Sequence, residues 1–359
     1  MTGIDRVGIP VYTSVRPHAA PGLNTMTSGK GMTDDAAWVS AAMEAIERKF
    51  CEPRGCDRVG TYEHLAEREL ALDPRKLNLR RGHRWIPSSE LGWCWMTELS
   101  TGAEVLVPAA VLFTPFEDRL DMFTSNTIGL ASGASTEEAL LHALYEVLEH
   151  DATAFGEVGF VGHTVTRESL PDLVADLFDR FERAEVSTQL YYFPGRTGMP
   201  TFYATIRDER VPDPLLINGG AGCDADPQTA ALRALCEAAQ SRLIVIAGSR
   251  EDLDQENYRR QLSYQAAKER LDLWSGNWVP IDFDEIPALP AGAVADQLGE
   301  TLSRVRASGL PLVLARIMTG PQDPLSVVRV VVPGIEYTHL DKRRCGTAMT
   351  ALLAERETA

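Results

Sequence analysis

The alternation of apolar and polar positions along the chain predicts a mixture of short strands and helices. Apolar runs of the length and composition typical of strands occupy residues 6–13, 187–192, 201–207, 311–317 and 326–333. Stretches with a helical apolar spacing occupy residues 34–52, 165–185, 257–273 and 295–308. This mixture predicts an α/β fold.

Three expected helices follow glycine-rich segments that we interpret as turns. They are the helix at residues 34–52 and two more, which carry Glu146 and Glu237. The segments are residues 28–31, 124–133 and 216–222. Asp34 or Asp35 is the expected cap of the first helix, and Ser135 with Glu138 forms a capping box for the second. Asp226 followed by Pro227 predicts an N-cap and a proline at the first helical position of the third.

Each of these three helices carries a polar pair whose members are three residues apart. The pairs are Glu44 with Glu47, Glu146 with Glu149, and Glu237 with Gln240. Side chains at this spacing lie on one face of a helix. One pair alone also fits a solvated helix surface, but the repetition favours a site. If the three faces converge, five carboxylates share a pocket that needs a cation, and oxygen ligands suit Mg²⁺.

The surrounding residues predict phosphate binding beside those acids. Glycines allow backbone N–H groups to approach a phosphate, and Lys30 lies between two of them. Arg16, Arg48 and Arg242 offer planar guanidinium donors. Together with Mg²⁺ these groups suit phosphoryl transfer, although residues 28–31 lack the Walker A spacing and Lys30 also fits a surface loop.

Composition and charge exclude several classes of partner. The 359 residues carry a net charge of −16, which argues against nucleic acid and against an anionic membrane surface. The N-terminus lacks a signal-peptide pattern, and the apolar runs are too short to span a bilayer. The six cysteines contain no Cys-x-x-Cys pair, which disfavours a zinc ribbon and indicates a cytosolic protein with reduced thiols. No linker divides the chain, so we expect one domain over residues 1–359.

The ordered set of motifs resembles the YcaO family over about residues 5–340. The matching segments are residues 8–11, 16–17, 29–31, 40–48, 126–133, 146–149, 237–242 and 328–334. The resemblance implies a YcaO-like α/β fold in which units of a Gly-rich loop plus a helix surround a single nucleotide cleft. It also implies ATP and Mg²⁺ as cofactors, a ribosomally made precursor peptide as substrate, and a homodimer.

The resemblance carries over to individual positions of this chain. The implied metal ligands are Glu44, Glu47, Glu146, Glu149 and Glu237. The implied nucleotide contacts are Lys30, Ser40, Asn126, Gln240 and Arg242, to which the phosphate argument adds Arg48. One position departs from the pattern, because His150 stands where the family usually has arginine; we expect a structural role for it.

The implied reaction is ATP-dependent activation of a peptide backbone amide. We expect cyclodehydration, which forms an azoline or a macrocyclic amidine, because no feature for sulfur delivery is visible. The chain resembles compact standalone members, and its C-terminus has no proline-rich tail. The alternatives are thioamidation beside a TfuA-type partner, a non-catalytic nucleotide-binding scaffold subunit, and a plain Mg²⁺-dependent phosphohydrolase.

Overall fold

The computed structural model divides the chain into two compact units. It describes residues 1–68, 70–80, 82, 85–116, 120, 122–158, 162–249, 263–276, 278–337 and 344–358. Unit 1 comprises residues 1–19, 24–45 and 156–291, and unit 2 comprises residues 20–23, 46–155 and 292–359. Helix α1 (Asp34–Phe50) begins in unit 1 and ends in unit 2. The prediction of a single domain stays a prediction.

Unit 1 is built on an antiparallel hairpin and a mixed sheet. The hairpin pairs β1 (Val11–Val15) with β2 (Met26–Lys30). In the described part of unit 1, a five-stranded sheet has the order β11-β10-β9-β8-β12, and β12 pairs with β8 in parallel. The strands are β8 (His163–Val165), β9 (Val186–Phe193), β10 (Thr201–Asp208), β11 (Ile217–Cys223) and β12 (Val279–Ile281). The helices are α4 (Asp172–Arg183), α5 (Pro227–Ile246) and α7 (Tyr264–Ser275).

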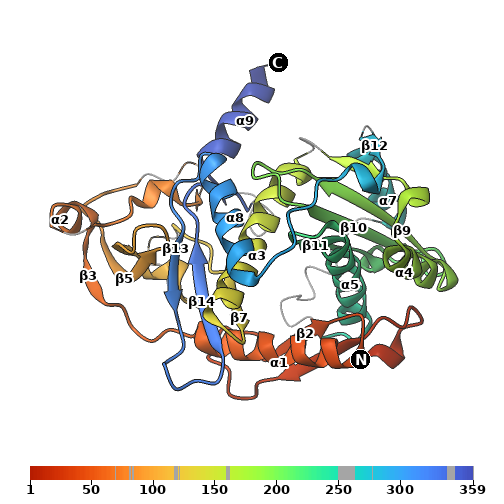
Figure 1. Cartoon of the computed structure of the whole chain (residues 1–359), viewed down its shortest axis with the longest axis horizontal. Helices are drawn as coiled ribbons and strands as arrows, with labels where there is room; N and C mark the ends of the chain where they lie inside the picture. Colours follow the sequence, from red (N-terminus) through yellow and green to blue (C-terminus); the bar gives the residue numbers. More distant parts are fainter. Residues whose placement is uncertain are drawn as a thin grey trace. The chain divides into compact units, whose positions relative to one another are not determined.

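The core of unit 1 lies between that sheet and helices α4 and α5, which are drawn in green in Figure 1. Phe202, Ala204 and Ile206 alternate along β10 and are buried on this face, as expected for a half-buried strand. Helix α5 contributes small residues at helical spacing, including Ala230 and Ala234, which are fully buried. Small side chains on α5 allow its backbone to approach the sheet closely.

Unit 2 contains a larger antiparallel sheet. In the described part of unit 2, a six-stranded sheet has the order β3-β5-β13-β14-β7, with β6 paired to β5. Its strands are β3 (Arg58–Thr61), β5 (Glu90–Glu98), β6 (Glu104–Pro108), β7 (Leu130–Gly133), β13 (Leu314–Ile317) and β14 (Ser326–Val331). The pair of β13 and β14 lies side by side in Figure 1. The short strands β4 (Leu79–Arg80) and β15 (Arg344–Cys345) also pair.

The helices of unit 2 are α2 (Tyr62–Ala66), α3 (Thr136–Glu157), α8 (Val294–Ala307) and α9 (Thr347–Thr358). Short 3₁₀ segments complete the described chain at Thr2–Ile4, Pro74–Lys76, Ala109–Val111, Arg167–Ser169, Pro214–Leu216 and Phe283–Glu285. Among the described residues, no helix combines the length and the apolar character that crossing a membrane requires. All six cysteines are free thiols.

The α/β class is confirmed, and several predicted boundaries are wrong. The strand predicted at residues 6–13 begins only at Val11, because Gly8 has a φ of +73° and Pro10 has no N–H to donate. The helix predicted at residues 165–185 is a 3₁₀ turn followed by α4, with Pro171 preceding α4. Strands predicted at residues 311–317 and 326–333 are shorter, and residues 257–262 of a predicted helix lie outside the described residues.

Two of the three predicted helix starts are confirmed, and the predicted cap of α1 is wrong. Asp34 and Asp35 lie inside the first turn of α1, and the Thr33 hydroxyl accepts a hydrogen bond from the Ala36 N–H at 3.2 Å. The Asp226 side chain accepts hydrogen bonds from the backbone N–H groups of Gln228 and Thr229, and Pro227 opens α5. The Ser135 hydroxyl accepts from the Glu138 N–H at 3.1 Å, and the Glu138 carboxylate accepts from the Ala134 N–H at 2.9 Å. The bonds to the N–H groups of Gln228, Thr229 and Glu138 satisfy donors that the first turn of a helix leaves without an intrahelical partner, and the bond from Ala134 ties the preceding residue to α3.

Candidate functional site

The glycine-rich segments place helices against strands at very short range. Segment 216–222 was predicted as a turn, but most of it is strand β11. A Cβ on Gly222 would lie 2.1 Å from the Ala230 carbonyl oxygen, and a Cβ on Gly220 would lie 2.3 Å from the Ala238 N. These glycines therefore make room for the backbone of α5, which a turn interpretation based on local sequence missed.

The same device recurs at the other two segments. A Cβ on Gly29 in β2 would lie 1.9 Å from the Ala41 N of α1, and a Cβ on Gly133 in β7 would lie 2.7 Å from the Ala139 N of α3. Close helix packing, rather than a loop wrapped around phosphate, is thus the structural use of the glycines at these positions. Gly29, Gly133, Gly220 and Gly222 lie in strands, so the prediction that they belong to loops or turns is wrong.

Glu237 on α5 is held by two groups of unit 1. Its Oε1 accepts a hydrogen bond from the Ala221 N–H of β11 at 3.3 Å. Its Oε2 forms an ion pair with the Lys30 ammonium of β2, and both side chains are partly exposed. A cation therefore already lies against this predicted metal ligand, and the backbone fixes the orientation of the carboxylate.

Two further predicted nucleotide contacts gather around β2. The Ser40 hydroxyl of α1 accepts from the Lys30 N–H at 3.3 Å. The Gln240 side-chain amide, one turn along α5 from Glu237, donates to the carbonyl oxygen of Ser28. The structure thus brings Lys30, Ser40, Glu237 and Gln240 together within unit 1. Glu44, on the part of α1 that belongs to this unit, is half-buried.

The acids of unit 2 are also held by neighbouring groups. Glu47 is buried and accepts a hydrogen bond from the Ser132 hydroxyl of β7. The Glu146 Oε2 accepts from the Gly129 N–H at 3.1 Å. Gly129 has a φ of +80°, and a Cβ there would lie 2.3 Å from the Val330 carbonyl oxygen. Glu149, one turn further along α3, is buried.

His150 lies beside one of these acids. Its Nε2 is 3.9 Å from the Glu146 Oε1, one helical turn away, and both side chains are partly exposed. The imidazole therefore faces a predicted metal ligand rather than packing only against apolar groups. The expected structural role of His150 stays a prediction.

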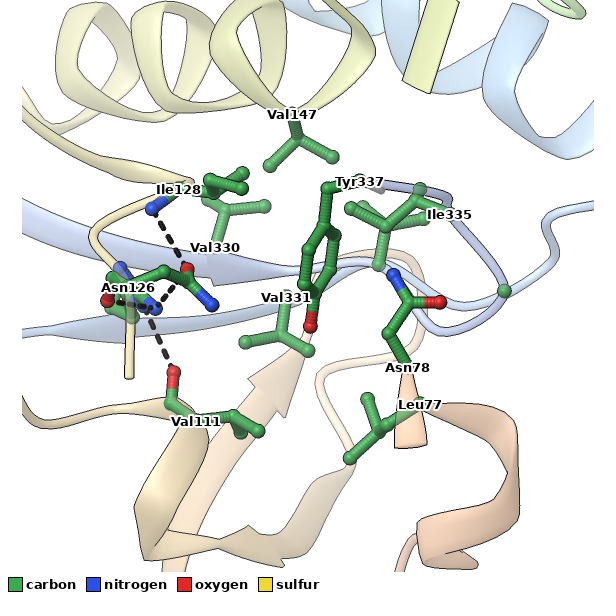
Figure 2. Close-up of a pocket in the computed structure, with 13 residues that line it drawn as sticks. Leu77, Asn78, Val111, Asn126, Ile128, Val147, Val330, Val331, Ile335 and Tyr337 are labelled. Carbon is green, nitrogen blue, oxygen red and sulfur yellow. Dashed lines mark hydrogen bonds between the residues drawn. The ribbon is translucent and has the colours of Figure 1, made fainter. Parts of the chain in front are cut away.

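Asn126 belongs to a buried network in unit 2. Its side chain accepts from the Ile128 N–H at 3.0 Å and donates to the Thr124 carbonyl at 2.9 Å. The Arg329 guanidinium donates to the Asn126 carbonyl oxygen at 3.0 Å and to the Val111 carbonyl oxygen at 3.0 Å. Figure 2 shows the bond between Asn126 and Ile128 and the bonds that the guanidinium makes to Asn126 and Val111. They give Asn126 a structural role beside its predicted contact with a nucleotide.

The cavity in Figure 2 lies next to this network. It has a volume of about 30 Å³ and is lined mainly by Val, Ile and Leu side chains together with Asn78, Asn126, Arg329 and Tyr337. A space of this size holds about one water molecule and excludes a nucleotide. A larger cavity of about 280 Å³ between β9, β10 and α7 contains none of the predicted site residues.

Arg329 was missed as a site residue by the sequence argument, although an arginine inside the apolar run 326–333 is itself a signal. Its side chain is buried, and burial lowers the pKa of Arg329 while the nearby Glu146 carboxylate opposes that change. Arg48 lies close enough to add to the lowering. The guanidinium thus places positive charge near Glu146, one of the predicted ligands of α3.

Arg242 occupies a different environment from the one expected for a nucleotide contact. Only 1% of its side chain is exposed, and its guanidinium lies 3.1 Å from the Asp5 carboxylate and 2.8 Å from the Asp208 carboxylate. Arg6 also donates to Asp208 at 2.6 Å. This buried cluster joins the N-terminal segment to β10 and α5, which favours a structural role for Arg242.

Within the residues that the structure describes, no group of three or more His, Cys, Asp or Glu side chains is close enough to hold a metal ion. The predicted convergence of all three helices involves residues of both units and stays a prediction.

Comparisons with known proteins support the resemblance drawn from the motifs. Residues 28–336 match the family described as YcaO cyclodehydratase, ATP- and Mg²⁺-binding. An uncharacterized protein of Methanothermobacter thermautotrophicus is 36% identical over 352 residues, which cover 96% of this chain and 91% of that protein. An uncharacterized protein in the tfuA 3′ region of Rhizobium leguminosarum bv. trifolii is 33% identical over 351 residues, which cover 94% and 82%.

A solved structure supports the fold over nearly the whole chain. The structure of YcaO from Methanopyrus kandleri bound with AMPPCP and Mg²⁺ matches with a TM-score of 0.77 and 27% identity, covering 96% of this chain and 87% of that one. A heterocyclase in complex with substrate and cofactor shares the fold with a TM-score of 0.75 at 20% identity, over 87% of this chain and 45% of that one. The chain therefore belongs to the YcaO family, whose members bind ATP and Mg²⁺ and modify the backbone of peptides.

Proposed function

We propose that this chain activates a backbone amide of a ribosomally made peptide by transferring the γ-phosphoryl group of ATP to the amide oxygen. The observation that carries the proposal is the way the acids are held. Glu237 and Glu146 each accept a hydrogen bond from a backbone N–H of the segment on which their helix packs. A carboxylate oriented by the backbone is ready to bind a cation without first losing rotamer freedom.

The predicted ligand set fits Mg²⁺ by its chemistry. Glu44, Glu47, Glu146, Glu149 and Glu237 supply carboxylate oxygens, the donors that Mg²⁺ prefers. In unit 1 the Lys30 ammonium lies against Glu237, and this ion pair supports the proposal that the carboxylate binds a cation. Bound Mg²⁺ and ATP would supply charge neutralisation and the phosphoryl group.

The side chains of this chain then act through position and charge. A cation held by Glu237 would free the Lys30 ammonium to contact a phosphate oxygen as a point charge. Ser40 and Gln240, which bond to the backbone of β2, keep that strand and its lysine fixed against α1 and α5. Arg48 is the proposed guanidinium partner of phosphate on the unit 2 side of α1.

We propose cyclodehydration as the outcome. A nucleophile within the peptide adds to the activated amide carbon, and the former amide oxygen leaves as phosphate, so the peptide loses the elements of water. The products are an azoline, or a macrocyclic amidine when the nucleophile is an amine. A homodimer and a cytosolic location complete this proposal as predictions.

Thioamidation is the second candidate, and one observation favours it. The Rhizobium relative lies in the tfuA 3′ region, which suggests that proteins of this type work beside a TfuA-like partner. In that case a sulfur nucleophile from the partner would replace the amide oxygen. The activation step and its demands on the chain would be the same.

The test is a reconstitution with candidate precursor peptides, chosen from short reading frames sought among the neighbouring genes. We expect ADP and phosphate, formed only when both Mg²⁺ and peptide are present. Cyclodehydration changes the peptide mass by about −18 Da and thioamidation by about +16 Da, as the exchange of atoms in a two-step displacement requires. AMP and pyrophosphate as products would contradict the proposal, and ATP hydrolysis without any peptide requirement would indicate a phosphohydrolase.

A further inference from the structure

A chain of buried hydrogen bonds links the acidic helix α3 to the C-terminal helix α9 within unit 2. Asp151 follows Glu149 by two positions on α3, and only 2% of it is exposed. Its Oδ1 accepts a hydrogen bond from the backbone N–H of Glu336 at 2.8 Å. The carboxylate thus fixes a segment that is distant in sequence.

The next step of the chain is the Glu336 side chain, which is completely buried. Its carboxylate accepts from the Gly346 N–H at 2.6 Å and from the Met349 N–H at 2.9 Å. These N–H groups lie at the start of α9, where a helix has no intrahelical acceptors and carries partial positive charge. Glu336 therefore acts as a cap supplied from a different part of the chain.

Gly346 leaves room for the side chains of this arrangement. A Cβ at Gly346 would lie 2.6 Å from the Glu336 Oε1 and 2.8 Å from the Asn78 Oδ1. Further along α9, Met349 is fully buried, whereas Thr350, Ala351 and Ala354 are exposed. The attachment of α9 is therefore concentrated in its first turn, at the Glu336 carboxylate.

We propose that Asp151 and Glu336 are positioning residues that hold the Glu146–Glu149 turn of α3 by tying it to the N-terminus of α9. This inference rests on the proposed function, since it assigns the consequence to metal binding by Glu146 and Glu149. Loss of a group that hydrogen-bonds directly to a ligand typically weakens metal affinity about ten- to hundredfold. Asp151 and Glu336 act through the position of α3, so we expect an effect at the lower end of that range.

The experiment compares Asp151→Ala with Asp151→Asn in the full-length protein. Asparagine keeps an oxygen that accepts from the Glu336 N–H, so it should retain the wild-type Mg²⁺ dependence of ATP hydrolysis, assayed with the precursor peptide present. Alanine should raise the Mg²⁺ concentration needed for half-maximal rate about tenfold, with a smaller change in the rate at saturating Mg²⁺. A merely structural role would lower the rate and the melting temperature but leave the Mg²⁺ requirement unchanged, and that result would overturn the inference.

A second variant keeps the test decisive if Asp151→Ala fails to fold. Glu336→Gln retains one acceptor oxygen for the start of α9 and should show an intermediate Mg²⁺ requirement. Adding Asp151→Asn to Glu336→Gln should cause no further change, because asparagine preserves the link. A Glu336→Gln protein with the wild-type Mg²⁺ requirement would contradict the proposed link.

Hydrogen exchange separates this inference from the proposed function. Glu336→Gln should speed exchange both at residues 146–150 of α3 and at residues 346–350 of α9, since each depends on the same carboxylate chain. Exchange that changes at α9 alone would overturn the link, whatever the activity. A wild type that never hydrolyses ATP would instead contradict the proposed function, while the exchange result would still decide the link.

Discussion

In unit 1, α5 packs on β11 and directs Glu237 toward the Ala221 N–H; in unit 2, α3 packs on β7 and directs Glu146 toward the Gly129 N–H. Both helices approach strands that lack a Cβ at the contact, at Gly220 and Gly222 in one case and at Gly133 in the other. The two regions therefore share two features. Glycines in the strand allow the helix to pack closely, and a backbone N–H orients the glutamate carboxylate of that helix by a hydrogen bond.

The two regions differ in how they stabilise a buried guanidinium. Arg242 of α5 lies between the carboxylates of Asp5 and Asp208. Arg329 of β14 donates to the carbonyl oxygens of Val111 and Asn126. Arg242 thus forms ion pairs with two carboxylates, whereas Arg329 donates to backbone carbonyl oxygens and has the Glu146 carboxylate only nearby. We expect this difference to appear in the stability of variants.

The largest expected effect comes from removing the arginine of unit 1. Arg242→Leu would remove the buried guanidinium that pairs with Asp5 and Asp208 and would leave Asp208 with Arg6 alone, which costs about 3–5 kcal/mol of unfolding free energy. Arg329→Leu would leave carbonyl acceptors unsatisfied at about 1–3 kcal/mol. Urea unfolding of the two variants measures the order, and an Arg329→Leu protein that is the less stable of the two would contradict the comparison.

A smaller loss of stability is expected from substitutions at the glycines on which the helices pack. Gly222→Ala places a Cβ 2.1 Å from the Ala230 carbonyl oxygen, and the overpacking should cost about 1–3 kcal/mol. Gly299→Ala in α8 is the control, because nothing lies within 4 Å of its Cβ position. That substitution should stabilise the helix by about 0.5–1 kcal/mol. Thermal unfolding that shows equal changes in both variants would argue against the packing role.

The smallest expected effect concerns acid stability of the Arg242 cluster. Burial opposes ionisation of Asp208, but hydrogen bonds from Arg6, the Val211 N–H and Arg242 outweigh it and lower the pKa of Asp208 to about 2. Because the folded pKa lies below the unfolded value of about 3.9, the stabilisation is present above that value and is lost as the pH falls toward the folded pKa.

Arg6→Met tests this assignment. The variant removes a hydrogen bond of 2.6 Å to Asp208, so the pKa of Asp208 in the folded protein should rise toward its value in the unfolded protein. The variant should therefore be less stable than wild type at neutral pH and should lose less stability between about pH 4 and pH 2. Melting temperatures across that range provide the measurement, and parallel curves for both proteins would refute the contribution of Arg6.

Local signals predicted the parts of this structure that local interactions determine. The N-cap at Asp226 and the capping box at Ser135 were predicted because a helix start depends on side chains within a few residues. The polar pairs on α1, α3 and α5 were predicted because helical spacing alone places them on one face.

The parts that the sequence did not reveal depend on distant residues. The sequence predicts a turn at residues 216–222 because glycine is rare in strands. The glycines of this segment are explained by the close packing of α5 on β11, which involves residues further along the chain. The phosphate contact predicted for Arg242 does not take account of Asp5 and Asp208, because these partners are distant in sequence and no local pattern indicates them. Arg329 was overlooked because its acceptors lie some 200 positions earlier in the chain.

The central claim is that Glu237 and Glu146, whose carboxylates are oriented by backbone N–H groups, bind the Mg²⁺ that accompanies ATP. The direct measurement is Mn²⁺ binding in the presence of ATP, followed by electron paramagnetic resonance, for wild type, Glu237→Gln, Glu146→Gln and the control Glu137→Gln. Glu137 is an exposed acid in the first turn of α3. Each of the first two variants should bind Mn²⁺ roughly ten- to hundredfold more weakly, and the control should bind as wild type does. Wild-type affinity in either Glu237→Gln or Glu146→Gln would contradict the account.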